Sequence, residues 1–558
     1  MVAADCAAAT ASPTPFAARL ATWARGAPPG RVAFTIADKN YAAYLADARL
    51  DAARAYGPRA AFLVVALDQT AEAHACAARV DTVRFDCRGA ARHAVYAAKY
   101  GVLAALLRLG RDVTFGEMDI WLLRDPLVGA ARADIVSGVH QDNPYNANAG
   151  WLHARADNGD VAALFEDLLR YCMTHPDAFD QQVLNCLLKA AARPQSSRDD
   201  CTLAQGASRD LGATADAILA PWTVPPSRVS YAFLGPDVLV AHARPYVLPT
   251  TVGIHVLTTI PLTDARAKTD VARELMFWPG AHGYYRIGDG ARYLAVDGGI
   301  LSTSRPSRFH AWRWVTAALA ELVWLARLTG RTLIWPRIFD FQQFHHAADH
   351  LDLRSVEALL GGWRAWREST FLANPRLDVV VGATYATVSL RTNASVAVVA
   401  RKAFDDSRLP TGRPGQGPSV ARTYTLPDLP RRRRAWGAWA VALADEDAAA
   451  ADVLLIDFEA VGEDDLRLAQ CFHGQPAWTC RRAVEAGDVP RELVLIQARL
   501  GWCRQKLGHE HAKAPNGEAT PVGYQPSKTC AVRLATGLLQ RARVVDPPGR
   551  DSLVDKRW

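Results

Sequence analysis

Short apolar segments alternate with helical segments along the first third of the chain. The segments Arg31–Ile36 and Ala61–Leu67 are rich in β-branched and aliphatic residues and are predicted strands. A helix ending near Tyr56 separates them, and a second helix, Ala90–Leu109, precedes the apolar run Val113–Phe115. Strands that are apolar on both faces and joined by helices are typical of a parallel sheet covered on both sides. The sequence therefore predicts an α/β fold with a mostly parallel sheet.

Two carboxylates directly follow the third of these strands. Glu117 and Asp119 are separated by one residue, and residues i and i+2 of an extended backbone point the same way. Ligands of parallel sheets bind beyond the carboxyl ends of the strands, where this pair is expected to lie. Paired hard oxygens suit a divalent cation that itself holds a diphosphate. A solvated acidic pair at a strand end is the alternative from the same residues.

The wider segment Val113–Leu127, VTFGEMDIWLLRDPL, resembles the acidic motif of nucleotide-diphospho-sugar transferases, and specifically of the plant and algal glycosyltransferase family 77. Two departures stand out: Glu117 replaces the usual Asp, and Trp121 falls one residue early. The resemblance implies a GT-A-like, Rossmann-type domain that binds a nucleotide sugar. It also implies that Glu117 and Asp119 hold Mn²⁺ or Mg²⁺.

The same resemblance assigns substrate-binding roles to two polar loops. Asp38 and Asn40 follow the first strand, where a GT-A domain contacts the nucleoside; a local turn or helix cap is the alternative for both. Asn148 and Gly150 match an N-x-G motif in the predicted loop Asn143–Trp151. A small residue there lets the backbone approach a sugar, and an amide can bond its hydroxyls. A plain turn needs the same residue types.

Two later motifs complete the expected site. Asp180 and Gln181 resemble the family's D-Q-x-x-x-N motif, which implies that they face the donor sugar near its reacting carbon; capping a helix is the other role for Asp180. His255 lies in an apolar strand, where a core histidine is the alternative, and Lys268 follows it. The resemblance makes His255 a third metal ligand and Lys268 a cation for the diphosphate.

The chain is long enough for two domains. Its 558 residues exceed one typical domain. We predict an Ala- and Pro-rich tail over residues 1–29, the nucleotide-sugar domain over 30–287 and a C-terminal α/β lobe over 288–558. The lobe is inferred from the predicted helix Phe309–Leu328 and the apolar strand Asp452–Phe458.

Composition excludes some classes of protein. Half of the residues are hydrophobic and the net charge is +7, which argues against wholesale disorder and against a nucleic-acid-binding protein. No apolar run is long enough to span a membrane. A secretory or Golgi lumen is expected from the family resemblance. Four cysteines near the C-terminus would permit disulfides there, with free buried thiols as the alternative: Cys471, Cys480, Cys503 and Cys530.

The sequence and the family resemblance thus predict a metal-dependent, retaining glycosyltransferase. The resemblance implies a UDP-sugar donor, with a pentose or galactose as the sugar, and a glycan or glycoprotein acceptor. A sugar-nucleotide-binding scaffold without turnover is the alternative, because Glu117 departs from the motif. A metal-dependent nucleotide hydrolase would share the acidic pair but does not predict the later motifs in their order.

Overall fold

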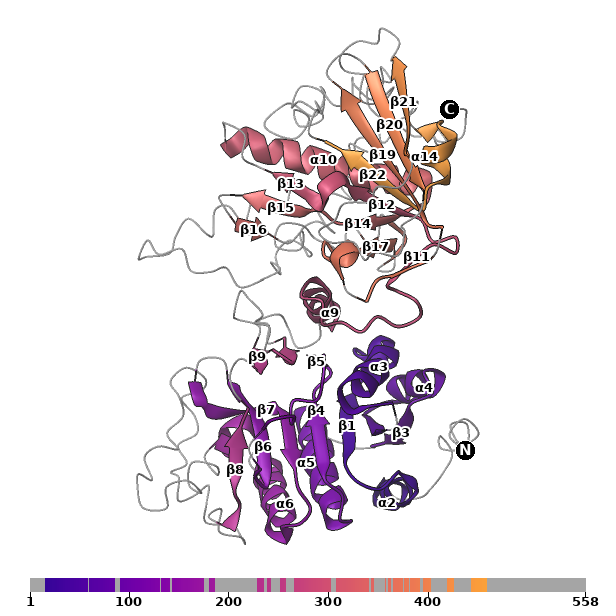
Figure 1. The fold of residues 1–558 in the computed structure, drawn as a ribbon. Helices are drawn as coiled ribbons and strands as arrows, with labels where there is room; N and C mark the ends of the chain where they lie inside the picture. Colours follow the sequence, from indigo (N-terminus) through magenta and orange to yellow (C-terminus); the bar gives the residue numbers. More distant parts are fainter. Residues whose placement is uncertain are drawn as a thin grey trace, which may run out of the picture. The chain divides into compact units, whose positions relative to one another are not determined.

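The computed structural model contains two compact units, Met1–His282 and Gly283–Trp558 (Figure 1). In the first unit it describes residues 16–58, 60–85, 91–130, 132–140, 143–174, 180–185, 228–234, 238–241, 251–256 and 265–282. In the second it describes residues 283–302, 308–340, 343–345, 357, 360–362, 365–374, 376–380, 382–391, 395–402, 419–425 and 443–458. No helix in these ranges is long and apolar enough to cross a membrane. The four C-terminal cysteines singled out above lie outside them.

A seven-stranded sheet forms the centre of the first unit, in the order β3-β2-β1-β4-β7-β6-β8 (Figure 1). All its strands run parallel except β7, which is antiparallel to both of its neighbours. The predicted α/β fold with a mostly parallel sheet is therefore confirmed. The strands are β1 (Val32–Ala37), β2 (Ala61–Ala66), β3 (Asp81–Arg84), β4 (Val113–Gly116), β6 (Ile135–His140), β7 (Asn143–Ala154) and β8 (Tyr231–Phe233).

Helices cover this sheet and bury its apolar side chains. The two longest, α5 (Ala91–Arg108) and α6 (Gly159–Thr174), pack together and bury Tyr100, Leu103 and Phe165 with the strands. Burial of such side chains is the main favourable term in folding, about 25 cal/mol for each Å² of apolar surface removed from water. The remaining helices are α2 (Phe16–Gly26), the 3-10 turn η1 (Ala42–Tyr44), α3 (Leu45–Tyr56) and α4 (Gln69–Ala77).

The segment expected to be an N-terminal tail contains helix α2. Its residues Leu20 and Ala24 are buried in the same core as α5, and Trp23 donates a hydrogen bond to Asp81 at 2.9 Å. The Ala- and Pro-rich composition concealed an amphipathic helix whose apolar residues recur one turn apart. Residues 16–26 thus belong to the folded unit.

The prediction of a loop over Asn143–Trp151 is wrong, because these residues form most of strand β7. Its Asn, Pro and Gly content suggested a turn, yet Ala147 and Ala149 alternate into the core in the manner of a strand. The pairing of β7 with β6 shifts register after Ser137, so that Gly138 faces Asn148. Such an irregularity accommodates turn-type residues within a ladder.

A second, three-stranded sheet brings late residues next to the acidic segment. Its order is β5-β10-β9, with β5 (Ile120–Leu122) antiparallel to β10 (Gly253–His255) and β9 (Leu239–Ala241) parallel to β10. His255 lies opposite Ile120 in this ladder. Helix α9 (Ala265–Glu274) follows along the chain.

The second unit is also of α/β type. Its seven-stranded sheet has the order β17-β14-β12-β22-β19-β20-β21, and β20 and β21 join it as antiparallel strands. Two smaller sheets, β11-β18 and β13-β15-β16, accompany it. The elements are β11 (Arg286–Ile287), β12 (Tyr293–Val296), β13 (Ile300–Ser302), α10 (Arg308–Thr329), β14 (Thr332–Ile334), β15 (Arg337–Asp340), β16 (Gln343–His345), β17 (Trp366–Arg367), β18 (Asp378–Val379), β19 (Thr384–Arg391), β20 (Ser395–Lys402), β21 (Ser419–Thr425), α14 (Glu446–Ala450) and β22 (Val453–Asp457).

Candidate active site

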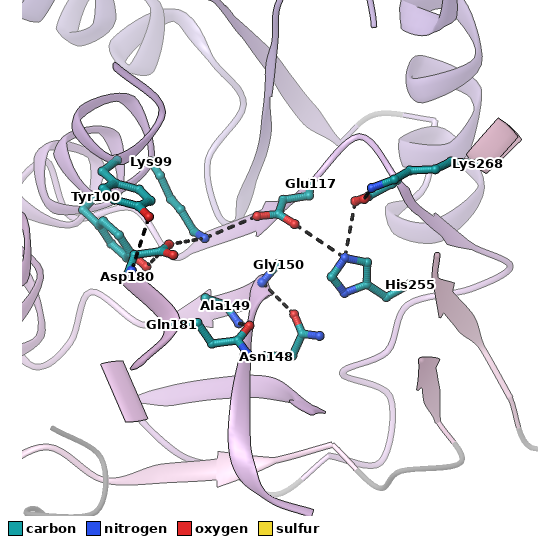
Figure 2. A network of polar contacts seen from close by, with 12 residues as sticks. Lys99, Tyr100, Glu117, Asn148, Ala149, Gly150, Asp180, Gln181, His255 and Lys268 are labelled. Atoms are coloured by element: carbon teal, nitrogen blue, oxygen red, sulfur yellow. Dashed lines mark hydrogen bonds and ion pairs between the residues drawn. The ribbon is translucent and has the colours of Figure 1, made fainter. Parts of the chain in front are cut away.

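Three predicted metal ligands converge at the end of strand β4 (Figure 2). One ligand atom each of Glu117, Asp119 and His255 lies within 4.8 Å of the other two. The His255 Nε2 atom is 3.5 Å from a Glu117 oxygen and 3.4 Å from an Asp119 oxygen. His255 is far from the two carboxylates in sequence, and the antiparallel pairing of β5 with β10 brings it next to them. We call Glu117, Asp119 and His255 the metal group.

Backbone hydrogen bonds hold the turn that carries the two carboxylates. The Glu117 N–H donates to the carbonyl of Gly150 on β7 at 2.8 Å, and the Asp119 carbonyl accepts from the N–H of Val256 at 3.0 Å. The turn closes on itself through the Ile120 N–H, which donates to the Glu117 carbonyl at 3.1 Å. The two acids are thus anchored to two different sheets, which limits how far either can move.

Two lysines supply positive charge beside the carboxylates. Lys268 of α9 forms an ion pair with Asp119, and Lys99 of α5 lies 3.5 Å from Glu117. The side chain of Glu117 is 38% exposed, whereas those of Asp119 and His255 are 8% and 5% exposed. A ligand that enters from solvent therefore meets Glu117 first.

Neighbouring charges shift the pKa of each of these three side chains in the direction that favours its charged form. Burial raises the pKa of Glu117, but Lys99 and His255 lower it by more, so the net pKa falls below its usual value. Burial likewise raises the pKa of Asp119, and Lys268 and His255 outweigh it. Burial lowers the pKa of His255, whereas Asp119 and Glu117 raise it to about 9 overall. The two carboxylates therefore stabilise a positive charge between them.

This donor set fits a divalent cation. Two carboxylates and one imidazole are ligands of Mn²⁺ in proteins, and carboxylates also suit Mg²⁺. One buried oxygen of Asp119 has no hydrogen-bond partner among the described residues, so it can accept a metal bond. The Nδ1 atom of His255 is also buried without a hydrogen bond there, and the Nε2 atom faces the carboxylates.

Gly150 leaves the space in which this group forms. A β-carbon at this position would lie 2.5 Å from His255 Cε1 and 2.8 Å from a Glu117 oxygen. Contacts this short are excluded by van der Waals repulsion, so any larger residue would displace a ligand. Asn148 is fully buried and its side-chain oxygen accepts a hydrogen bond from the Gly150 N–H at 2.8 Å. The N-x-G motif thus lies beside the metal group, on strand β7.

Asp180 and Gln181 lie on the other side of this motif (Figure 2). The Gln181 side chain accepts a hydrogen bond from the Ala149 N–H at 3.3 Å. Asp180 is buried and accepts from Lys99 Nζ at 3.0 Å and from the Tyr100 hydroxyl at 2.7 Å. Its carboxylate is therefore engaged by helix α5.

Sequence reasoning missed Lys99 and Tyr100. Lys99 is 1% exposed and contacts both Asp180 and Glu117, so it connects the D-Q motif with the acidic pair. A signal was present: Lys99 is the only charged residue between Ala94 and Leu107 in an otherwise apolar helical segment. A buried lysine requires a partner, which in this case lies outside its own helix.

Asp38 and Asn40 form a local turn at the end of β1. The Asp38 carboxylate accepts from the Asn40 backbone N–H at 3.0 Å and from its side-chain amide at 2.8 Å. The intervening Lys39 N–H donates at 2.7 Å to Asp68, which caps helix α4. Among the described residues no hydrogen bond joins Asp38 or Asn40 to the metal group. Their nucleoside-binding role stays a prediction.

One family model matches part of the chain: residues 59–234 match the nucleotide-diphospho-sugar transferase family. The matched part contains the acidic pair, the N-x-G motif and Asp180. His255 and Lys268 lie beyond the matched residues, and the fold places both beside Asp119. No curated protein matches the sequence significantly.

Several solved glycosyltransferases are similar in part. The bifunctional glycosyltransferase WbbM has 12% identity and a TM-score of 0.26, with 41% of this chain and 46% of that chain covered. An active-site mutant of LgtC has 12% identity and a TM-score of 0.24, with 43% and 94% covered. GlyE of Streptococcus pneumoniae TIGR4 has 9% identity and a TM-score of 0.27, with 55% and 74% covered.

These overlays are partial, and the chain spans about half (46%) of the length of WbbM. TM-scores this low do not establish a common fold. Membership in family 77 stays a prediction. Residues 59–234 match the nucleotide-diphospho-sugar transferase family, which is the class of protein that the sequence predicted for this domain.

Proposed function

We propose that the protein transfers a sugar from a UDP-sugar to a hydroxyl group of a glycan or glycoprotein, with retention of configuration and with Mn²⁺ or Mg²⁺. The observation that carries this proposal is the convergence of Glu117, Asp119 and His255 at the end of β4. Pentose and galactose donors, and the glycan or glycoprotein acceptor, are suggested by the resemblance of the acidic segment to family 77.

Glu117, Asp119 and His255 would hold the ion, which supplies positive charge to the diphosphate. Lys268, which pairs with Asp119, would supply a further positive charge beside the same phosphates. Lys99 neutralises Glu117 and Asp180 from the opposite side of the group. The site therefore concentrates positive charge where the leaving group would develop negative charge.

The residues of the N-x-G and D-Q motifs would position the sugar. The Asn148 and Gln181 side chains bond backbone N–H groups of β7 and are thereby oriented next to the metal group. In the retaining reaction the bond between the anomeric carbon and the phosphate oxygen breaks, and a bond to the acceptor oxygen forms on the same face. The departing phosphate oxygen takes the acceptor proton, so no separate base is needed.

The test is Mn²⁺-dependent binding of UDP and hydrolysis of UDP-sugars by the full chain. Asp119→Ala should abolish both while the circular dichroism spectrum stays unchanged, because this carboxylate contacts both His255 and Lys268. Asp157→Ala is the matched control, since Asp157 is an exposed aspartate whose ion pair is with Arg155. Metal-dependent UDP binding by folded Asp119→Ala protein would overturn the proposal.

A second outcome of the same assay concerns the scaffold alternative. Glu117 in place of the usual Asp favours that alternative, because the longer side chain moves the carboxylate outward. Mn²⁺-dependent UDP binding without hydrolysis or transfer, over a panel of UDP-pentoses and UDP-hexoses, would identify a scaffold. Nucleotide hydrolysis without any sugar dependence would instead identify a hydrolase.

We also propose a secretory or Golgi lumen as the location. Cys76 is disulfide-bonded, and disulfides persist in oxidising compartments. Mass spectrometry of the protein alkylated without reductant tests this assignment. Alkylation of Cys76 in protein purified from its native source would argue against it.

A further inference from the structure

Helix α3 presents a polar face toward strand β5 and the segment that follows helix α9. Asp47, Asp51 and Arg54 recur at helical spacing along one face, and the two aspartates are 4% and 7% exposed. Charged residues are almost never this buried unless they are paired. Asp51 and Arg54 pair with each other through atoms 2.5 Å apart. The face therefore has a specific set of partners.

The first partner is strand β5, which begins directly after Asp119. Both carboxylate oxygens of Asp51 accept from the Leu122 N–H, at 3.0 and 3.1 Å. The Arg54 Nε–H donates to the Leu122 carbonyl at 2.6 Å. The two side chains thus bind both polar groups of one residue, on the edge of β5 that does not pair with β10. Side chains of helix α3 thus bind the edge of β5 to which a further strand could otherwise pair.

The second partner is the segment after helix α9, which carries Lys268. A terminal nitrogen of Arg54 donates to the Phe277 carbonyl at 2.7 Å. The Phe277 N–H in turn donates to the Ala272 carbonyl at 2.8 Å, so holding Phe277 holds the end of α9. Ala272 lies one helical turn from Lys268, on the same face.

One guanidinium group therefore connects the two segments that form the Asp119–Lys268 pair. Asp119 lies just before the strand that Arg54 binds, and Lys268 lies on the helix whose end it binds. Asp51 orients the guanidinium through its ion pair and accepts a hydrogen bond from the Leu122 N–H. Asp47 strengthens the same junction, since it accepts from the Ala281 N–H at 2.6 Å.

We infer that Arg54, oriented by Asp51, is a positioning residue for the metal and diphosphate site. It acts through Asp119 and Lys268 and sets the separation of this carboxylate from this ammonium group. The inference rests on the proposed function, because it requires that these two groups bind a metal-bound UDP moiety. Outer groups that orient metal ligands typically contribute 10- to 100-fold to affinity.

The test measures Mn²⁺-dependent UDP affinity by calorimetry in the full chain. Arg54→Met should weaken binding by roughly 10- to 100-fold. Arg54→Lys, which keeps the charge but cannot bond Leu122 and Phe277 together, should recover only part of this loss. Arg49→Met is the matched control and should bind like the parent, since Arg49 lies on the exposed face of the same helix and donates to Ala78.

The outcomes separate the inference from the function on which it rests. Parent protein that binds no UDP with Mn²⁺ overturns both. Parent-like affinity in folded Arg54→Met, with binding abolished in Asp119→Ala, overturns the inference alone and leaves the metal site intact. A lower melting temperature without weaker binding has the same meaning, because it assigns Arg54 to stability. If Arg54→Met does not fold, Arg54→Lys decides by the same affinity, and failure of both to fold also overturns a positioning role.

Discussion

The ammonium group of Lys99 lies 3.0 Å from a carboxylate oxygen of Asp180, and both side chains are buried. The same nitrogen is 3.5 Å from Glu117, so one lysine links the D-Q motif to the metal group. Burial lowers the pKa of Lys99, but Asp180 and Glu117 raise it above its usual value overall. Lys99 therefore stays charged in the folded protein and offsets two of the site's carboxylates.

Replacing this lysine should destabilise the first unit. In Lys99→Met the buried Asp180 carboxylate keeps the hydrogen bond from the Tyr100 hydroxyl but loses its ion pair with the lysine. Removing one partner of a buried pair costs about 3–5 kcal/mol of unfolding free energy. Urea unfolding followed by tryptophan fluorescence measures this loss.

The double variant Lys99→Met/Asp180→Asn provides the control for the lysine. It removes the uncompensated charge and should regain more than half of the lost stability, as expected for two directly coupled residues. Full stability in Lys99→Met alone would show that Asp180 does not depend on this pair.

Gly150→Ala should weaken metal binding more than stability. Its β-carbon would lie 2.5 Å from His255 and 2.8 Å from Glu117, so the two ligands must separate. We expect a loss of Mn²⁺ affinity of about 10-fold or more, which is the effect typical of disturbing the groups that orient metal ligands. Overpacking should cost about 1–3 kcal/mol of unfolding free energy. Calorimetric Mn²⁺ titration and thermal unfolding measure the two effects.

Gly101→Ala is the matched control for this substitution. A β-carbon at Gly101, within helix α5, would meet only Leu169 at 3.7 Å, which is an ordinary contact. Alanine also suits a helix interior better than glycine, by about 1 kcal/mol. Gly101→Ala should therefore keep metal affinity and gain stability. Equal metal affinity in Gly150→Ala and Gly101→Ala would contradict the role assigned to Gly150.

Local sequence pattern predicted the strands and the acidic pair well. Apolar runs bounded by Gly and Pro placed β1, β2 and β4 within a residue of their ends, because burial in a parallel sheet requires such runs. The convergence of His255 with Glu117 followed from the family resemblance alone. No spacing rule joins residues this far apart in sequence, and their meeting depends on the pairing of β5 with β10.

Long-range side-chain contacts were beyond the reach of the sequence. Arg54 sits in an ordinary helical pattern. The isolated charge of Lys99 in an apolar helical segment indicates a partner but does not identify it, because the long-range partners of both residues lie on other elements. Strand β7 was missed for a related reason. Its Asn and Gly residues favour a turn locally, and only the two neighbouring strands, with an irregular register, make it extended.

Glu117→Asp should change metal preference and leave the fold intact. Shortening the side chain by one methylene draws the carboxylate away from His255, from which it is now 3.5 Å distant. A wider site suits Mn²⁺ better than Mg²⁺, which demands near-ideal short bonds, so Mg²⁺ affinity should fall more. Because Glu117 is 38% exposed, the change in unfolding free energy should stay below about 1 kcal/mol.

Parallel titrations of parent and variant with each metal test this prediction, and the ratio of the two affinities is the quantity of interest. Lower stability with an unchanged affinity ratio would mark Glu117 as a structural residue. An unchanged ratio with unchanged stability would remove Glu117 from the ligand set.

His153 should make the protein lose stability in mild acid. It is buried on β7, with its Nδ1 atom 3.0 Å from the Thr114 hydroxyl. Burial, together with the charge of Arg31, lowers the pKa of His153 from 6.5 to about 4. The unfolded chain therefore binds a proton at a higher pH than the folded protein does. The stabilisation is fully present above pH 6.5 and is lost as the pH falls toward 4.

The site's other shifted groups titrate outside this window. The pKa values of Glu117 and Asp119 lie below their usual values, so their contribution to stability is lost only at lower pH. The raised pKa of His255, about 9, contributes stability that is constant below pH 6.5 and declines only as the pH rises above it. A change between about pH 6.5 and 5 thus isolates His153 from these groups, because the ordinary pKa of Glu117, 4.5, lies below that window.

His153→Gln should therefore flatten the pH dependence of stability in this window. Glutamine can keep a hydrogen bond to the Thr114 hydroxyl but takes up no proton, so the variant should lose less stability on acidification than the parent. The pKa difference between 6.5 and about 4 corresponds to a full effect on the order of 3 kcal/mol, at about 1.4 kcal/mol for each pKa unit, of which roughly 2 kcal/mol falls between pH 7 and pH 5. Urea unfolding at about pH 7 and about pH 5 measures the slope in both proteins. The same slope in parent and variant would show that folding does not lower the pKa of His153, and that its burial beside Arg31 does not determine its charge.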